Sequence, residues 1–311
     1  MNFLTMKIKL FILILCISFF SKQINAIENK ILFKVNNKII TSIDIQNEIK
    51  YLNAINPSFI DLEKEKQLEI SKNSLIRIKT KEITLKKIVK KIELDDLDFK
   101  RILISNFSTV GINKIDELSN YLNQYDLKIE MLRERIEIES FWNQFIYSKY
   151  KDNIKIDVES IKKNIMNNIK QKEYLLSEIV FNLESKENLN EKYEEIKQTI
   201  NTKGFENSAL IYSMSDSVNV GGKLGWISES SINQAILNEL SKIEINNFTK
   251  PIKIPSGFLI LKINEMKETN KNLNLEEELE KIIRVKTNEQ LNQYSNLFFN
   301  KAKKDVKIDE L

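Results

Sequence analysis

The sequence predicts an α+β protein in which a mostly helical body is joined to one smaller module of strands and helices. The first observation is the scarcity of turn-forming residues: the 311 residues include 6 glycines and 3 prolines, whereas average usage would give about 22 and 16. This composition favours long helices over a β-sandwich, a propeller or a glycine-rich nucleotide fold. The second observation is that five of the six glycines and two of the three prolines lie between residues 204 and 257. This clustering indicates a separate module.

The absence of histidine from the sequence excludes several kinds of chemistry. No Ser-His-Asp or Cys-His nucleophile can be built, no imidazole can act as a general base, and no zinc site can use histidine ligands. The one cysteine, Cys16, lies in an apolar run near the start of the chain. The sequence therefore predicts neither a metal site nor a cofactor.

Residues 1–26 are predicted to be a secretory signal peptide. Lys7 and Lys9 precede an apolar run, 10–20, that is too short to span a membrane, and a polar segment ends at the small residue Ala26. We expect cleavage near Ala26 and export of the chain. Cleavage would remove the only cysteine, which rules out disulfides, and three lysines, which lowers the formal net charge from +4 to +1. A nearly neutral chain gives no support to nucleic-acid binding.

The body, residues 27–170, is expected to begin with a hairpin. Its first residues, 31–40, form two β-rich runs around an Asn-Asn pair, and asparagine tolerates the positive φ of a tight turn. Thr41 and Asp44 then form a capping-box pattern that starts a helix.

Apolar residues at helical spacing predict a bundle of four to six helices between about residues 61 and 170. One predicted face repeats at i, i+3, i+4 and i+7 through Leu85, Ile88, Val89 and Ile92. Six lysines between Lys79 and Lys91 are interpreted as a solvated helix face, with transient contact to anionic membrane lipids as the alternative.

The module, residues 171–268, alternates strand and helix patterns. The predicted elements are a strand at 174–181, helices at 190–202, 205–213 and 231–240, and strands at 250–254 and 258–265. Pro255 and Gly257 suit the tight turn between the last two strands.

The remaining residues, 269–311, are expected to return to the body. Polar residues 267–275 are interpreted as a linker, and an amphipathic helix follows over about 276–304 with a short strand-like end at 306–308. Because a helix with such an apolar face is not stable alone, we expect it to pack on the N-terminal bundle.

Motifs around the clustered glycines resemble the parvulin family of prolyl isomerases. A pattern F-x-x-x-A-x-x-Y-S begins at Phe205, and the runs GGKLGW and PSGFLILKI follow from Gly221 and Pro255. In addition, the run VNNKIITSID from Val35, the helical region and the C-terminal helix resemble SurA-type periplasmic chaperones. Many such chaperones have two parvulin domains, whereas this chain has room for one.

The resemblance also implies where isomerase chemistry would lie. Active parvulins have one histidine in the first strand and another in the last, hydrogen-bonded beneath the proline pocket, and the matching positions here are Glu178 and Leu259. The family's cysteine or aspartate after the second helix falls at Ser215 or Asp216. Because Leu259 cannot form a hydrogen bond, we expect the parvulin-like domain to be catalytically weak or inactive.

The function implied by the resemblance is a periplasmic chaperone. Such a protein binds unfolded outer-membrane β-barrel proteins, or other exported polypeptides, and assists their folding and assembly. Aromatic side chains are the candidate peptide contacts: Phe205, Trp226 and Phe258 in the module, and Phe141 and Tyr147 in the body.

Two other functions stay open from the sequence. The first is a divergent peptidyl-prolyl cis-trans isomerase that uses Glu178, Ser215 or Asp216 in place of the usual network. The second is an anchored secretion factor, which would require that the signal segment be retained.

Overall fold

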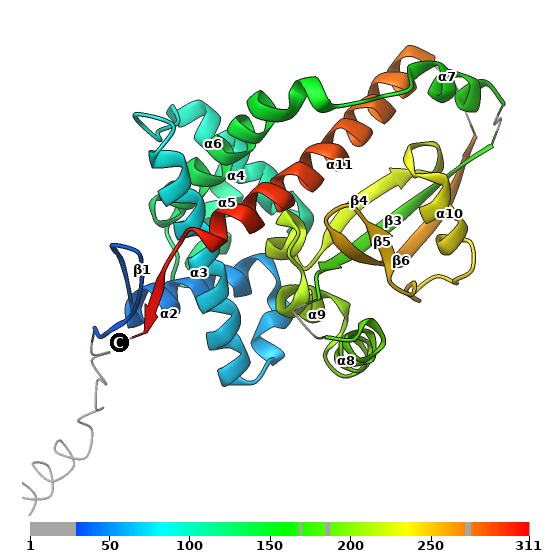
Figure 1. Ribbon diagram of the computed structural model, residues 1–311. Helices are drawn as coiled ribbons and strands as arrows, with labels where there is room; N and C mark the ends of the chain where they lie inside the picture. Colours follow the sequence, from blue (N-terminus) through cyan, green and yellow to red (C-terminus); the bar gives the residue numbers. More distant parts are fainter. Residues whose placement is uncertain (1–28, 168–169, 184–186, 271–274, 311) are drawn as a thin grey trace, which may run out of the picture.

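The computed structural model describes residues 29–167, 170–183, 187–270 and 275–310. The predicted signal peptide, residues 1–26, lies outside these residues. Within the described ranges, no helix combines the length and apolarity needed to cross a membrane. Figure 1 shows a helical body on one side and a sheet-containing module on the other, so the predicted α+β class is confirmed.

The N-terminal hairpin forms as predicted. Strands β1 (Ile31–Val35) and β2 (Lys38–Thr41) pair antiparallel, and Asn36 takes the positive φ of the turn, at 50°. Helix α2 (Ser42–Ile55) begins with the capping box: the Thr41 backbone N–H donates to Asp44 Oδ2 at 2.8 Å, and the Asp44 N–H donates to Thr41 Oγ1 at 3.3 Å.

The rest of the body is helical. The α-helices are α3 (Lys64–Lys86), α4 (Asp96–Phe107), α5 (Ile115–Asn123), α6 (Arg133–Tyr150) and α7 (Val158–Asn167). Short 3₁₀ turns separate several of them: η1 (Pro57–Asp61), η2 (Ser108–Val110), η3 (Ile129–Leu132) and η4 (Lys151–Asn153). The predicted continuation of α3 to Ile92 is wrong, since that helix ends at Lys86. Val89 and Ile92 nevertheless pack against the cluster around Trp142, which explains their apolar character.

The C-terminal part of the chain completes the body. Helix α11 (Leu275–Lys304) packs on α3, α6 and α7, and strand β7 (Ile308–Glu310) pairs with β1 to give a three-stranded sheet of order β2-β1-β7. The core at this junction is aromatic, with Trp142 of α6 fully buried between Phe298 and Phe299 of α11. The body is therefore built from two segments that are far apart in the sequence.

The module between these segments is a four-stranded antiparallel sheet with helices on both faces. Its elements are β3 (Lys170–Phe181), α8 (Leu189–Lys203), α9 (Phe205–Tyr212), η5 (Asp216–Val220), β4 (Lys223–Ser228), η6 (Glu229–Ser231), α10 (Gln234–Leu240), β5 (Ile252–Ile254) and β6 (Gly257–Asn270). The strand order is β4-β3-β6-β5. Helices α8 and α9 cover one face, where Ile179 and Ile260 are buried against Ile196. Helix α10 covers part of the other face.

Residues 267–270 belong to strand β6 and do not form the predicted linker. They pair with residues 170–173 of β3 in continuous register. Their position at the end of the sheet explains why their side chains are polar. There, Glu173 forms ion pairs with Lys267 and with Lys281 of α11.

Candidate functional site

A cleft of about 950 Å³ lies between the module's sheet and helix α11. The sheet contributes an apolar wall that includes Leu176, Val180 and Leu259. Helix α11 contributes the opposite wall, and the segment that leads into α7, from Lys155 to Ile161, closes one side. In Figure 1, α11 runs past the sheet from the β7 end of the body toward α7.

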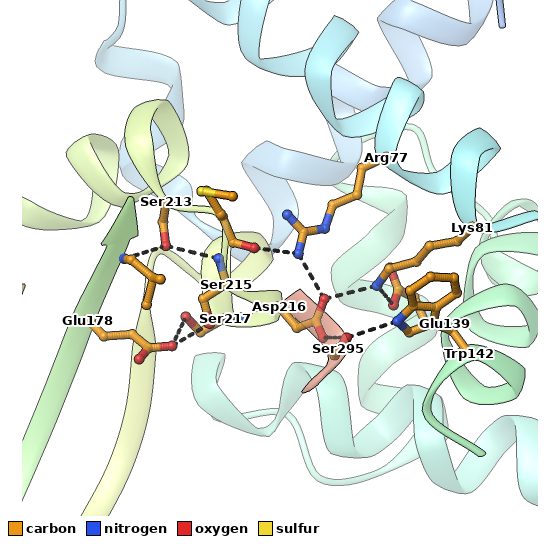
Figure 2. Close-up of polar contacts among 12 residues, drawn as sticks. Arg77, Lys81, Glu139, Trp142, Glu178, Ser213, Ser215, Asp216, Ser217 and Ser295 are labelled. Atoms are coloured by element: carbon orange, nitrogen blue, oxygen red, sulfur yellow. Dashed lines mark hydrogen bonds and ion pairs between the residues drawn. The ribbon is translucent and has the colours of Figure 1, made fainter. Parts of the chain in front are cut away.

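Glu178 on β3 lies in this cleft and is held by two serines of the loop after α9. Ser215 Oγ donates a short hydrogen bond to Glu178 Oε1, and Ser217 Oγ donates to the same oxygen at 2.9 Å (Figure 2). Burial raises the pKa of Glu178, while the two serine hydroxyls oppose this rise. No hydrogen bond to the second oxygen, Oε2, is present among the described residues, so Oε2 is available to the cleft.

A close backbone contact fixes this part of the site. The Glu178 N–H donates to the Gly222 carbonyl oxygen at 2.8 Å. Gly222 has a φ of +79°, and a Cβ at that position would overlap the carbonyl oxygen of Glu178. The second glycine of the GGKLGW run is therefore required for β3 and the glycine loop to approach each other.

Glu178 and Leu259, the two positions predicted to match the parvulin histidines, both line the cleft. Glu178 pairs in register with Leu261, and Leu259 lies two residues away on β6, opposite Val180. Leu259 is 6% exposed and packs in the apolar cluster of the sheet. One position thus offers a carboxyl group and the other offers only hydrocarbon.

Ser215 and Asp216, the two candidates for the family's cysteine or aspartate position, point in different directions. Ser215 reaches Glu178 in the cleft, whereas Asp216 reaches into the helical body (Figure 2). Asp216 Oδ1 accepts hydrogen bonds from Arg77 Nη2 and Lys81 Nζ of α3, each at 2.9 Å, and Asp216 Oδ2 accepts one from Ser295 Oγ of α11 at 3.0 Å. Burial opposes ionisation, but the charges of Lys81 and Arg77 outweigh it and hold the pKa of Asp216 well below its usual range.

Lys81 is completely buried, so the prediction of a solvated lysine face is wrong for this residue. The lysines at positions 86, 87, 90 and 91 are exposed, as predicted. Lys81 Nζ lies 2.6 Å from Glu139 Oε2 of α6 and 5.4 Å from the centre of the Trp142 ring. Trp142 Nε1 in turn donates to Ser295 Oγ at 2.9 Å. A single polar network therefore connects the loop of the module to three helices of the body.

The five predicted peptide-contact aromatics lie in different environments. Trp226 lines the cleft. Phe205 and Phe258 lie in the cluster on the opposite face of the sheet, where Phe258 stacks on Phe181. In the body, Phe141 packs partly buried near Trp142, and Tyr147 is 51% exposed. Only Trp226 of these five is among the residues that line the cleft.

Sequence reasoning missed the wall that α11 contributes. Its cleft-lining residues are Val285, Lys286, Asn288, Glu289, Gln290, Asn292, Gln293 and Asn296. A signal was present, because asparagines recur at spacings of four along a helix that was otherwise considered only for its apolar face.

Glu289 is the acidic group that α11 places in the cleft. Its side chain is exposed, but the surrounding cleft walls displace water around the carboxyl group and raise its pKa to about 7. The nearby Lys286 charge opposes this rise and Glu178 adds to it. Within the described residues, no group of three or more potential metal ligands is present.

The polar network at Asp216 predicts a large loss of stability when this aspartate is replaced by asparagine, which has the same shape but no charge. Asp216→Asn removes the negative charge and leaves Arg77 and the buried Lys81 without that partner, so we expect the free energy of unfolding to fall by about 3 kcal/mol. Chemical denaturation measures the change. Asp98→Asn is the matched control, because its ion pair with Arg101 is exposed and its loss costs less than about 1 kcal/mol. Equal losses in the two variants would contradict the prediction.

The raised pKa of Glu289 predicts that ionisation of this group lowers the stability of the protein as the pH rises. Because the folded protein binds this proton more tightly than a glutamate of ordinary pKa 4.5, ionisation between about pH 4.5 and 7 lowers the free energy of unfolding. Glu289→Gln should therefore raise the melting temperature more at pH 8 than at pH 5. Glu280→Gln, on the same helix but outside the cleft lining, is the control. A Glu289→Gln effect that is identical at both pH values would refute this assignment.

Comparison with known proteins supports the sequence resemblance. Residues 165–265 match the model of the rotamase family described as the PPIC-type PPIASE domain. Over 173 residues the chain is 22% identical to the chaperone SurA of Pseudomonas putida, a match that covers 51% of this chain and 40% of that protein. The chain thus matches less than half the length of this curated relative.

Solved structures of similar chains come from chaperones and isomerases. A chain from the structure of PEB4 and Cj1289, described as two SurA-like chaperones of Campylobacter jejuni, is 16% identical with a TM-score of 0.35, covering 91% of this chain and 99% of that chain. The peptidylprolyl isomerase PrsA of Bacillus anthracis is 21% identical with a TM-score of 0.31, covering 75% and 96%. The family match assigns residues 165–265 to the PPIC-type parvulin domain, within a chain that is similar to the chaperone SurA.

Proposed function

We propose that the protein is a periplasmic chaperone that binds unfolded exported polypeptides, outer-membrane β-barrel proteins among them, and that its parvulin domain contributes little catalysis. The observation that carries the proposal is the cleft itself. It retains an apolar sheet wall of the size that a peptide needs, while a leucine occupies one of the two positions that the isomerase network requires. The proposal therefore assigns peptide binding, and little catalysis, to this cleft.

The argument against efficient isomerisation is physical. Rotation about a prolyl peptide bond faces a barrier of about 20 kcal/mol, and an enzyme lowers it by desolvating the amide and by stabilising its twisted form. Here the only polar side chain of the pair is Glu178, whose Oε1 is occupied by two serine hydroxyls. The competing candidate, a divergent isomerase that uses Glu178 and Ser215, is favoured by the hydrogen bond between these two residues in the cleft.

The proposal also assigns a separate role to each part of the chain. Residues 27–170 together with 269–311 form the chaperone body, and residues 171–268 form the parvulin domain. An export signal over residues 1–26, cleaved near Ala26, is proposed from its basic start and apolar centre.

The proposed chaperone function is tested with an unfolded porin. The purified protein at equimolar concentration should suppress light scattering when the porin is diluted from urea, and it should cross-link to the porin during dilution. Bovine serum albumin at the same concentration is the control for nonspecific protection. If the protein neither delays aggregation nor cross-links, the proposal is wrong.

The isomerase alternative is tested with a proline-containing tetrapeptide. We expect the rate of cis-trans conversion to stay close to the uncatalysed rate, because the second hydrogen-bonding position is Leu259. An active parvulin measured alongside provides the scale. Turnover comparable with that enzyme would establish the alternative, and loss of this turnover in Ser215→Ala would locate it at the Glu178 site.

A further inference from the structure

The wall that α11 presents to the cleft is a row of side-chain amides. Asn288, Asn292 and Asn296 follow one another at spacings of four, and Gln293 lies beside them, so all four lie on one face of the helix. Side-chain amides both donate and accept hydrogen bonds, as a peptide backbone does. The face therefore matches peptide groups regardless of the residue type that they belong to.

The side-chain amides of Asn288 and Asn292 are accessible to a molecule in the cleft. Both residues are exposed, and neither amide forms a hydrogen bond among the described residues. Each amide can both donate and accept hydrogen bonds. A bound molecule with donors and acceptors along its length would therefore satisfy them.

Charged groups of both signs line the cleft. Three lysines and three acidic residues line it: Lys155, Lys253, Lys286, Asp157, Glu178 and Glu289. Because the pKa of Glu289 is about 7, its charge is partial near neutral pH. The lining therefore carries no large charge of either sign to attract a strongly acidic or strongly basic ligand. Uncharged segments fit this lining best.

We propose that the cleft holds an extended, uncharged segment of polypeptide, with its backbone hydrogen-bonded to the amide face of α11 and its apolar side chains against the sheet. This inference rests on the proposed chaperone function and assigns its binding site. The face from Val285 to Asn296 is about 17 Å long at the rise of an α-helix, which matches about five extended residues. The apolar wall opposite includes Leu176, Leu259 and Leu261.

Recognition of the backbone is tested with two peptides. The first is a capped seven-residue peptide of valine, leucine and threonine, and the second is the same peptide with alternate backbone nitrogens methylated. Two absent hydrogen bonds weaken binding by about tenfold, so the purified protein should bind the first peptide about tenfold more tightly. Fluorescence anisotropy of the labelled peptides measures both affinities.

The variant Asn288→Ala/Asn292→Ala removes two exposed amides of the cleft face, and the ratio of the two affinities should fall toward one. Asn120→Ala/Asn123→Ala is the matched control, because both residues are exposed on α5, away from the cleft, and the ratio should stay near ten. A wild-type ratio near one, or an unchanged ratio in the cleft variant, would overturn the inference.

The aggregation assay separates this inference from the function on which it rests. If the porin is protected but the peptide ratio is insensitive to the cleft variant, the chaperone function stands and the binding site lies elsewhere. If neither protection nor peptide binding is observed, both proposals fail.

Discussion

The carboxylate of Asp216 is the contact on which the relative position of the two parts of the protein depends. It lies on a loop of the parvulin domain and accepts hydrogen bonds from two helices of the body. Lys81 has no exposed surface, so its charge is tolerable only while Asp216 and Glu139 are both beside it. Because the neighbouring Ser215 holds Glu178, the same short loop fixes both the docking of the domain and the floor of the cleft.

Local features of the fold were predictable because they depend on residues close together in the sequence. The capping box of Thr41 and Asp44 and the turn at Asn36 are of this kind. Each of these features has a short motif with a steric or hydrogen-bonding cause.

Features that depend on distant pairing were not predictable. Nothing in the sequence around Lys81 distinguishes it from the other lysines of its run, because its partners Glu139 and Asp216 lie 58 and 135 residues away. The polar residues 267–270 were assigned to a linker since only their pairing with β3 makes them a strand. The choice between Ser215 and Asp216 likewise required the position of α3, which the motif does not contain.

The pairing of Lys170 with Asn270 has a consequence for the order of folding. The body needs α11 and β7 to reach β1 and α3, and the entropic cost of closing a loop grows with its length. Once the parvulin domain has folded, the two ends of residues 170–270 lie side by side, so the chain between the halves of the body no longer behaves as a long flexible loop. The folded parvulin domain thus holds the two segments of the body close together and lowers the entropic cost of packing α11 and β7 onto the rest of the body.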